Sequence, residues 1–287
     1  MRFEKWQALG NDYLIVEQAE LPFELTPPRI RALCAGHFGI FADGVLLLSP
    51  PADAQDVADL RIFNPDGSEA ELSGNGAREA ILYLRRRGWT DQQRFSIHTA
   101  AGRISPTITG PDSCRAHMGA ASLASPDFPS GPADGRGQLA EIEFQHVSIG
   151  NPQCAIRVAS EAELDALELP AIGPSIEGSE LFPNRTNVSW YTPVAPAPGG
   201  AERIRARIFE RGVGETLSSG TGASGAAIAH ALAHGDALPV TIEVLLEGGE
   251  LTVELGEGLD VHLTGWARPV FEGRISEDFA KELHETE

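Results

Sequence analysis

Apolar and polar positions along the chain form many short strand-like runs and a few helix-like stretches, which predicts an α+β protein. Runs of strand length with apolar or alternating character occur in both halves. The predicted strands are Val45–Leu48, Leu60–Phe63, Phe95–Thr99, Arg103–Ile108 and Arg115–Met118, then Glu141–Ile149, Ile204–Ile208, Val240–Leu246, Leu251–Leu255 and Val261–Thr264. Each half therefore contains enough strands for a mixed sheet of its own.

Three longer stretches carry helical signals. Thr26–Gly36 opens with the residue types of an N-cap and a first helical residue. A second helix is predicted over Gly74–Arg87, where the following Gly88 ends it. The third, Gly220–His234, consists of small and apolar residues and two histidines, without Asp, Glu, Lys or Arg. A helix without a charged face is normally buried, so we expect the third helix at the centre of its domain.

A segment of twenty residues recurs after 146 positions without a gap. Arg61–Ala80 aligned with Arg207–Ala226 gives nine identities in twenty positions, where unrelated segments would give roughly one or two. The identities include Arg-Ile-Phe before a loop and Ser-Gly-x-Gly-Ala after it. Because the period is far longer than that of a solenoid, the repeat indicates two similar domains.

The repeat leads to a division of the chain into two domains. We predict an N-terminal domain of residues 1–118 that also includes the C-terminal segment 266–287, and a second domain of residues 119–265. The Pro-, Gly- and Asp-rich segment Ser125–Gly137 is typical of a boundary loop. Thr192–Gly200 is typical of a loop that joins two strands within the second half.

Composition and charge exclude several classes of protein. The 287 residues are 42% hydrophobic and 22% charged, which is typical of a globular chain. A formal net charge of −19 argues against nucleic acid or an anionic membrane as a partner. The cysteines are scattered, and no apolar run reaches membrane-spanning length. His230 and His234 are four residues apart, but both lie near the end of the Ala-rich helix, which favours a role in packing or at the helix dipole over a zinc site. We therefore expect a cytoplasmic protein that holds no metal.

The two Ser-Gly-x-Gly-Ala turns are the candidate sites for chemistry. Glycines at the start of a helix let the backbone approach a ligand, and the N–H groups of the first turn attract an anion. Ser73 and Ser219 open these helices, and two matched units facing each other would place them on opposite sides of one cleft. In the alternative interpretation the serines are ordinary N-caps that bind nothing.

Polar residues in turn sequences accompany both serines along the chain. As a set they would suit a zwitterionic amino acid, with Arg211 and the helix ends binding its carboxylate and Glu210 its ammonium group. The candidate binding residues are Asn11, Asn64, Gly74, Asn75, Asn151, Asn187, Glu210, Arg211, Gly220 and Thr221.

These motifs, in this order, resemble the diaminopimelate epimerase family and, more broadly, the cofactor-independent racemase fold that includes proline racemase. The resemblance covers nearly the whole chain and is highly specific. The matching segments are Leu9–Tyr13, His37–Gly44, Arg61–Ser68, Gly74–Arg78, Gly150–Pro152, Asn187-Val188 and Glu210–Thr216.

The resemblance implies two pseudo-symmetric halves, each a barrel-like mixed sheet around a central helix, with the active site in the cleft between them. It implies interconversion of LL- and meso-diaminopimelate, a step of lysine and peptidoglycan precursor biosynthesis, by a homodimer without cofactor or metal. One residue of each domain would face the α-carbon, one removing its proton and the other returning a proton. In the family both residues are cysteines, and the matching positions here are Ser73 and Ser219.

Four positions depart from the family pattern. They are the two serines, Gln153, where the family usually has histidine, and Phe41, where it usually has glycine. A serine hydroxyl is a much weaker acid than a thiol and needs a neighbouring base. Two alternatives to this epimerization therefore remain: a divergent isomerase or lyase acting on another amino acid, and a catalytically impaired relative that only binds an amino acid.

Overall fold

The computed structural model describes residues 1–196 and 200–286, and the chain divides into two compact units. Unit 1 comprises Met1–Ala116 and Gly265–Glu287, and unit 2 comprises His117–Thr264. The chain passes from one unit to the other within strands β9 (Ser113–Ala120) and β18 (Asp260–Trp266). The Pro-rich segment 125–137, which we expected at the boundary, lies inside unit 2 instead, because extended strands make both crossings.

The first sheet mixes parallel and antiparallel pairs. Strands β1 and β2 pair antiparallel, β2 and β3 parallel, β3 and β4 antiparallel, and β4 and β6 parallel. Across the sheet its strands run in the order β19 (Arg268–Arg274), β1 (Arg2–Ala8), β2 (Asn11–Glu17), β3 (Val45–Ser49), β4 (Ala58–Phe63), β6 (Ile97–Thr99) and β7 (Gly102–Ile104), with β5 (Glu69–Ala70) paired to β4.

Helix α2 (Gly74–Arg86) packs on strands β1, β2 and β3 of this sheet. Its residues from Asn75 to Leu84 are all buried. An apolar cluster of unit 1 contains residues of helix α1 (Pro27–Cys34), the start of β1, and helix α6 (Glu277–Glu285). Unit 1 also contains the short helix η1 (Gln18–Glu20).

The second sheet is longer and is also mixed. Across it the strands run in the order β10 (Arg136–Leu139), β11 (Ile142–Ser148), β12 (Pro152–Arg157), β13 (Asn187–Pro193), β14 (Glu202–Glu210), β16 (Val240–Leu246), β17 (Gly249–Leu255), β18, β9 and β8 (Thr107–Gly110), with β15 (Gly214–Thr216) paired to β14. The helices of unit 2 are α3 (Glu161–Ala166), α4 (Leu169–Glu177), α5 (Gly220–His234) and the short η2 (Glu257–Leu259).

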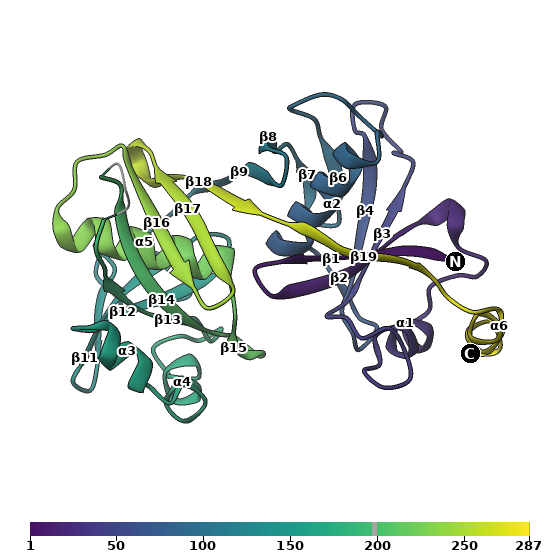
Figure 1. Ribbon diagram of the computed structural model, residues 1–287. Helices are drawn as coiled ribbons and strands as arrows, with labels where there is room; N and C mark the ends of the chain where they lie inside the picture. The colour runs from purple at the N-terminus through teal and green to yellow at the C-terminus, as the bar shows by residue number, and fades with distance from the viewer. Residues whose placement is uncertain (197–199, 287) are drawn as a thin grey trace. The chain divides into compact units, whose positions relative to one another are not determined.

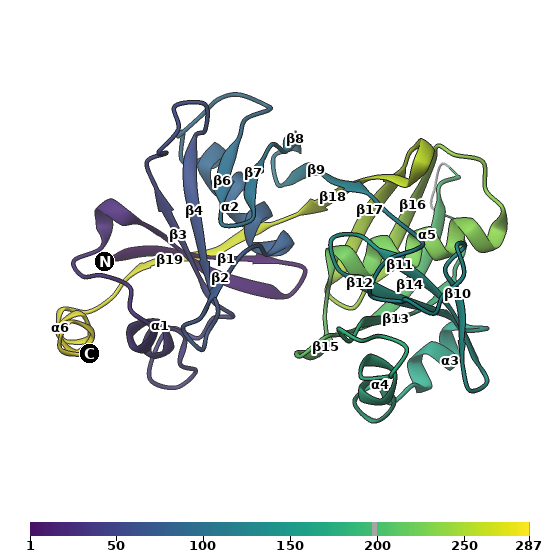
Figure 2. The same cartoon turned by 180° about the vertical axis from the view of Figure 1, so that it is seen from behind.

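Helix α5 lies inside the curve of the second sheet. It contacts β11, β12, β13, β14, β16 and β17. Strands β16 and β17 cross in front of it in Figure 1, and β11 and β12 cross it in the view from behind in Figure 2. Residues Gly222–Ala231 are all buried. The expected central helix is therefore confirmed, and its lack of charged residues follows from strands covering it on opposite sides.

The predicted α+β fold of two repeated units is confirmed, with three corrections. Each sheet follows an open path across the described strands, so neither is a closed barrel. The stretch 103–108, predicted as one strand, is split between β7 and β8, because Pro106 has no N–H to donate to a sheet. Thr26 stands at the N-cap of α1 but makes no side-chain capping bond.

Two further expectations concern connections. The loop predicted over Thr192–Gly200 lies between β13 and β14, which pair antiparallel, although its residues 197–199 fall outside the described part of the chain. The segment after Gly265 returns to unit 1, where β19 pairs with β1. Among the described helices, none has the length and apolar character needed to span a membrane.

Candidate active site

The same strand–hairpin–helix element presents a serine in each unit. In unit 1 strand β4 turns back into β5, so that Phe63 pairs with Glu69, and in unit 2 β14 turns back into β15, so that Phe209 pairs with Glu215. An arginine at the matching place of each strand braces the hairpin: Arg61 bonds Glu69 at 2.8 Å, and Arg207 bonds Glu215 at 2.7 Å. The sequence repeat is thus also a repeat of structure.

Both serines are N-caps. Ser73 Oγ accepts a hydrogen bond from the backbone N–H of Gly76 at 3.1 Å, and Ser219 Oγ accepts one from Gly222 N–H at 3.3 Å. The second glycine of each turn also allows close packing. A Cβ atom on Gly222 would lie 2.8 Å from the Ile208 side chain. These glycines therefore bring each helix start close to its sheet and hold the serine there.

The second partner of each serine differs between the units. Ser219 Oγ donates to the Glu210 carboxylate at 3.0 Å, and Thr216 Oγ1 donates to the other Glu210 oxygen at 2.8 Å. In unit 1 Ser73 Oγ instead accepts a hydrogen bond from the Tyr13 hydroxyl at 3.2 Å. The two candidate proton-transfer groups therefore stand beside different chemistry, a carboxylate in one unit and a phenol in the other.

This asymmetry arises at matched positions of the repeat. Asn64 stands where unit 2 has Glu210, since the repeat offset is 146 residues. The Asn64 side chain donates to Ser68 Oγ at 3.0 Å. An amide can act neither as a general base nor as an anion near neutral pH, so unit 2 alone carries a carboxylate at this matched position.

The carboxyl group of Glu210 is tuned toward accepting a proton. Burial raises the pKa of Glu210 above its ordinary value, and the hydrogen bonds from Thr216 and Ser219 oppose the rise. A carboxylate with a raised pKa is a stronger base at neutral pH than an exposed one. The sequence predicts an ammonium-binding role for Glu210 and contains no local signal for its bond to Ser219.

The raised pKa of Glu210 predicts that Glu210→Gln changes how the free energy of unfolding depends on pH. In the unfolded chain this carboxyl has a pKa of about 4.3, whereas in the folded chain it keeps its proton to higher pH. The two pKa values bound a pH window above about 4.3. As the pH rises through this window the unfolded chain binds fewer protons than the folded chain, so the free energy of unfolding falls. Glu210→Gln should therefore gain stability relative to the unchanged chain as the pH rises above about 4.

Urea unfolding measured at several pH values checks this expectation. The matched control is Glu143→Gln, because Glu143 is exposed on β11 of the same unit. Parallel stability curves for Glu210→Gln and the unchanged chain would contradict a raised folded pKa.

The other predicted residues of unit 1 are tied into local networks. Asn11 donates its side-chain N–H to Asp43 at 2.8 Å. Asn75, the second residue of α2, is buried and accepts a hydrogen bond from the guanidinium of Arg78. Burial lowers the pKa of Arg78. Asn75 therefore serves to satisfy a buried cation inside unit 1.

In unit 2 a chain of side-chain amides leads to the start of α5. Gln153, fully buried on β12, donates to Asn151 Oδ1 at 2.7 Å, and Asn151 donates to Thr221 Oγ1 at 3.3 Å. Asn187 donates to the carbonyl of Pro152 at 3.1 Å. Gln153 thus positions the residues around the first turn of α5 and does not itself reach the Ser219 hydroxyl in this network.

Arg211, predicted to bind a substrate carboxylate, is held by groups of the protein itself. Arg211 is exposed, donates one guanidinium N–H to the carbonyl of Asn184 at 2.8 Å, and is held by its own backbone N–H on Asn187. Phe41 has φ of 62° and is 64% exposed, with the Lys5 ammonium 5.5 Å from its ring centre. A left-handed backbone favours glycine, which is a physical reason why the family pattern has glycine where this chain has Phe41.

The structure connects some of the predicted residues to the serine turns by hydrogen bonds and ties others, such as Asn11 and Arg211, into separate local networks. Around Ser73 it adds Tyr13, which the sequence motif Leu9–Tyr13 contained but to which we assigned no role. In unit 2 Ser219 bonds Glu210, and Asn151 bonds Thr221 in the first turn of α5. Tyr13 and Ser73 are 60 residues apart in the chain, so no local sequence pattern predicts their contact.

Comparison with known proteins supports a family assignment. The model of the diaminopimelate epimerase family matches residues 3–124 and 145–266. Diaminopimelate epimerase 2 of Nostoc sp. is 38% identical over 286 residues, covering 96% of this chain and 96% of that protein. Diaminopimelate epimerase of Pelotomaculum thermopropionicum is 37% identical, covering 95% and 98%.

Solved structures extend the likeness at the level of the fold. A phenazine biosynthesis protein of the PhzF family from Bacillus anthracis aligns with a TM-score of 0.67 at 17% identity, covering 96% of this chain and 99% of that one. A probable proline racemase from Agrobacterium radiobacter aligns with a TM-score of 0.64 at 16% identity, covering 96% and 93%. With the family match in both halves and relatives of this identity over nearly the full length, the chain belongs to the diaminopimelate epimerase family of isomerases.

Proposed function

We propose that this protein interconverts LL- and meso-diaminopimelate by proton transfer at the α-carbon, with Ser73 and Ser219 acting on opposite faces and without a cofactor. The observation that carries the proposal is the hydrogen bond from Ser219 to the partly buried carboxylate of Glu210. A serine hydroxyl becomes a competent proton acceptor when a neighbouring base takes its own proton. Glu210 has the position and the raised pKa for that role.

The proposed step conserves protons and electrons. The α C–H bond breaks, its proton moves to Ser219 Oγ, and the Ser219 hydroxyl proton passes to Glu210. The electron pair left on the α-carbon is delocalised into the substrate carboxylate. Ser73 then delivers its proton to the opposite face and receives one from Tyr13, its hydrogen-bond partner. Exchange with solvent restores Glu210 and Tyr13, and the reverse reaction uses the same groups in the opposite order.

The helix ends supply the second element of the proposal. Gly74 and Asn75 begin α2, and Gly220 and Thr221 begin α5. N–H groups of a first helical turn and the positive end of the helix dipole favour a carboxylate. Negative charge builds up on the substrate carboxylate when the α-proton leaves, so donors held in place before the reaction stabilise that state.

A second candidate function rests on the capping bonds. Both serine hydroxyls already accept a helix N–H, as an N-cap that takes no part in chemistry also does. The resemblance places cysteine at these two positions in the family. A relative that binds an amino acid and has lost proton transfer would keep the polar residues of both units and lack the thiols.

Solvent-deuterium incorporation separates the two candidates. The protein is incubated with LL- or meso-diaminopimelate in D₂O, and loss of the α-proton and inversion are followed by NMR. We expect exchange with inversion in the unchanged chain and exchange at least about tenfold faster in Ser73→Cys/Ser219→Cys, because a thiol is far more readily ionised.

The matched control is Ser218→Cys, which adds a thiol next to Ser219 without replacing the N-cap. It should exchange at the rate of the unchanged chain. No exchange in the unchanged chain together with exchange in the double variant would support the binding-only candidate. No exchange in either chain would count against diaminopimelate as the substrate.

The expected homodimer, which rests on the resemblance, and the expected cytoplasmic location, which rests on composition, stay predictions. Size-exclusion chromatography with light scattering tests the first, and cell fractionation tests the second.

A further inference from the structure

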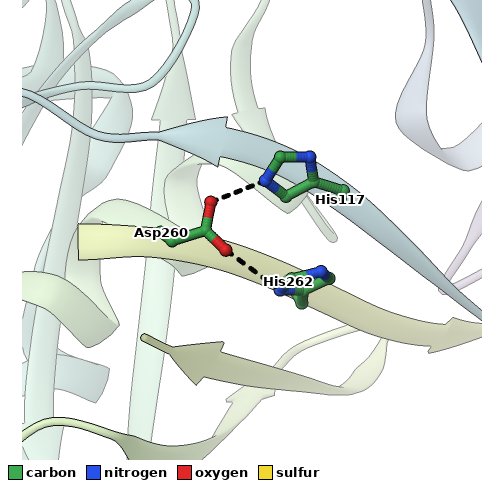
Figure 3. Close-up of side chains that lie close together, drawn as sticks. All are labelled: His117, Asp260 and His262. Carbon is green, nitrogen blue, oxygen red and sulfur yellow. Dashed lines mark hydrogen bonds and ion pairs between the residues drawn. The ribbon is translucent and has the colours of Figure 1, made fainter. Parts of the chain in front are cut away.

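A cluster of three metal-ligand side chains lies in unit 2, outside the groups assigned to proton transfer. His117 extends from β9, and Asp260 and His262 extend from β18, the neighbouring strand of the sheet. Figure 3 shows both histidine rings directed toward the Asp260 carboxylate. His117 Nε2 lies 2.6 Å from one Asp260 oxygen, and His262 Nδ1 lies 3.6 Å from the other.

The strand geometry accounts for this convergence. Residues two apart on a strand point to the same face of the sheet, so Asp260 and His262 share a face. Strand β9 runs beside β18 and places His117 next to them, with the two histidine ring centres 4.8 Å apart. The three side chains are thus held by two paired strands, which are a firmer support than a loop.

We propose that His117, Asp260 and His262 bind a zinc ion. The ligand atoms of the three residues all lie within 4.8 Å of one another. Zinc bonds to histidine nitrogen and carboxylate oxygen measure about 2.0–2.2 Å in tetrahedral geometry, which separates two ligands by about 3.4 Å. The two separations from Asp260, 2.6 Å to His117 and 3.6 Å to His262, lie on either side of this value.

The donor set selects the class of metal. Two imidazoles and one carboxylate suit zinc and its neighbours in the transition series, whereas calcium and magnesium prefer oxygen ligands alone. The side chains are 55%, 41% and 26% exposed for His117, Asp260 and His262. Solvent therefore reaches the cluster and can supply the fourth ligand.

The position of the cluster suggests what the ion does. His117 is the first residue of unit 2, and β18 is the strand in which the chain leaves that unit. A metal bound there would join the two ends of unit 2 and close nearly the whole unit into one loop. Cross-links that close long loops restrict the unfolded chain the most, and a ligand that binds only the folded state stabilises it by mass action.

The test uses the full chain after treatment with a chelator. Zinc chloride is titrated by isothermal calorimetry, and cobalt chloride is added to a parallel sample to record its visible absorption spectrum. We expect one zinc ion per chain at this cluster, a cobalt spectrum of low coordination number, and a Tm that rises by several degrees with zinc at about 100 times its Kd.

Variants assign the binding to these residues. His117→Ala and His262→Ala should each weaken zinc binding at least about tenfold, because each removes one of three ligands. His284→Ala, which removes an exposed histidine of α6, should leave it unchanged. A second group, Glu202, His234 and Asp236, provides the competing location.

Two results would overturn the proposal. One is a chelator-treated chain that binds no zinc in the calorimeter. The other is zinc binding that survives in both His117→Ala and His262→Ala, or that is lost in His234→Ala instead. Neither result depends on whether the protein epimerizes diaminopimelate, since every measurement reports on the metal itself.

Discussion

Glu210→Gln should lower the rate of α-proton exchange by roughly 10²- to 10⁴-fold, the usual contribution of a positioned general base. The expectation follows from the proposed function. Glutamine keeps the size of the side chain and a hydrogen bond to Ser219 but does not accept a proton. Ser219 then has no neighbouring group to take its hydroxyl proton when it removes the proton from the α-carbon. The rate is measured by deuterium incorporation at saturating diaminopimelate.

The pH dependence of the exchange rate is a second test of Glu210 as the base. Glu210 must be ionised to act, so the rate should fall as the pH drops below its raised pKa. This acid limb should disappear in the residual activity of Glu210→Gln. The matched control is Glu202→Gln on the same strand, where the carboxylate bonds His230 at 2.9 Å instead of a serine. It should keep the rate of the unchanged chain.

Ammonium binding by Glu210, the role expected from the sequence, predicts a different pattern of kinetic constants. Loss of an ammonium contact mainly raises KM and leaves kcat at saturating substrate close to its original value. A lowered kcat with little change in KM therefore supports proton transfer. A tenfold or greater rise in KM with unchanged kcat would refute the assignment of Glu210 as the base.

Gly44→Ala should lower the free energy of unfolding by about 3 kcal/mol, the upper part of the range for overpacking a core. Gly44 precedes β3, and its backbone is buried. A Cβ atom there would lie 2.2 Å from the carbonyl oxygen of Phe63 and 2.7 Å from the ring of Tyr13. The carbonyl belongs to a paired strand and cannot rotate away, so the backbone of β3 or β4 must shift.

The same substitution should also slow exchange at the α-carbon. The Tyr13 ring must move away from the added methyl group, and its hydroxyl is the partner of Ser73 at 3.2 Å. Tyr13→Phe separates the two effects, because it removes the hydroxyl and leaves the ring in place. We expect Tyr13→Phe to slow exchange while costing only about 1 kcal/mol of stability.

Urea unfolding of Gly44→Ala is compared with that of Gly74→Ala. A Cβ on Gly74 would find its nearest atom 4.0 Å away, at the end of the Arg78 side chain. The added methyl group has room, so Gly74→Ala should change stability by less than about 1 kcal/mol. If Gly44→Ala unfolds at the same urea concentration as Gly74→Ala, the close packing around Gly44 is not as the structure describes it.

Local signals in the sequence were enough for much of the fold. The helix Gly220–His234 was predicted at its observed bounds, because a run of small residues followed by Gly235 determines both its burial and its end. The repeat of Arg61–Ala80 identified two units. Each conclusion depends on residues close together in the chain, where spacing reflects helical or strand periodicity directly.

The sequence was less informative about strand bounds and strand order, because pairing between distant segments determines both. The stretch predicted as one strand breaks at Pro106 and joins different partners on its two sides. A barrel-like sheet was expected from the resemblance, whereas the strand order leaves both sheets open. Strand order depends on which edges meet in space, and no short pattern in the chain encodes it.

By itself, then, the sequence determined the family, the two-unit plan and the serines at the starts of two matched helices, because duplicated motifs and capping residues are local. Only the tertiary structure decided what each serine touches: Tyr13 for Ser73 and Glu210 for Ser219. It also joined His117 to Asp260 across 143 residues of chain. Such contacts exist only after strands have paired and hydrogen-bond partners distant in sequence have been brought within 3 Å or so.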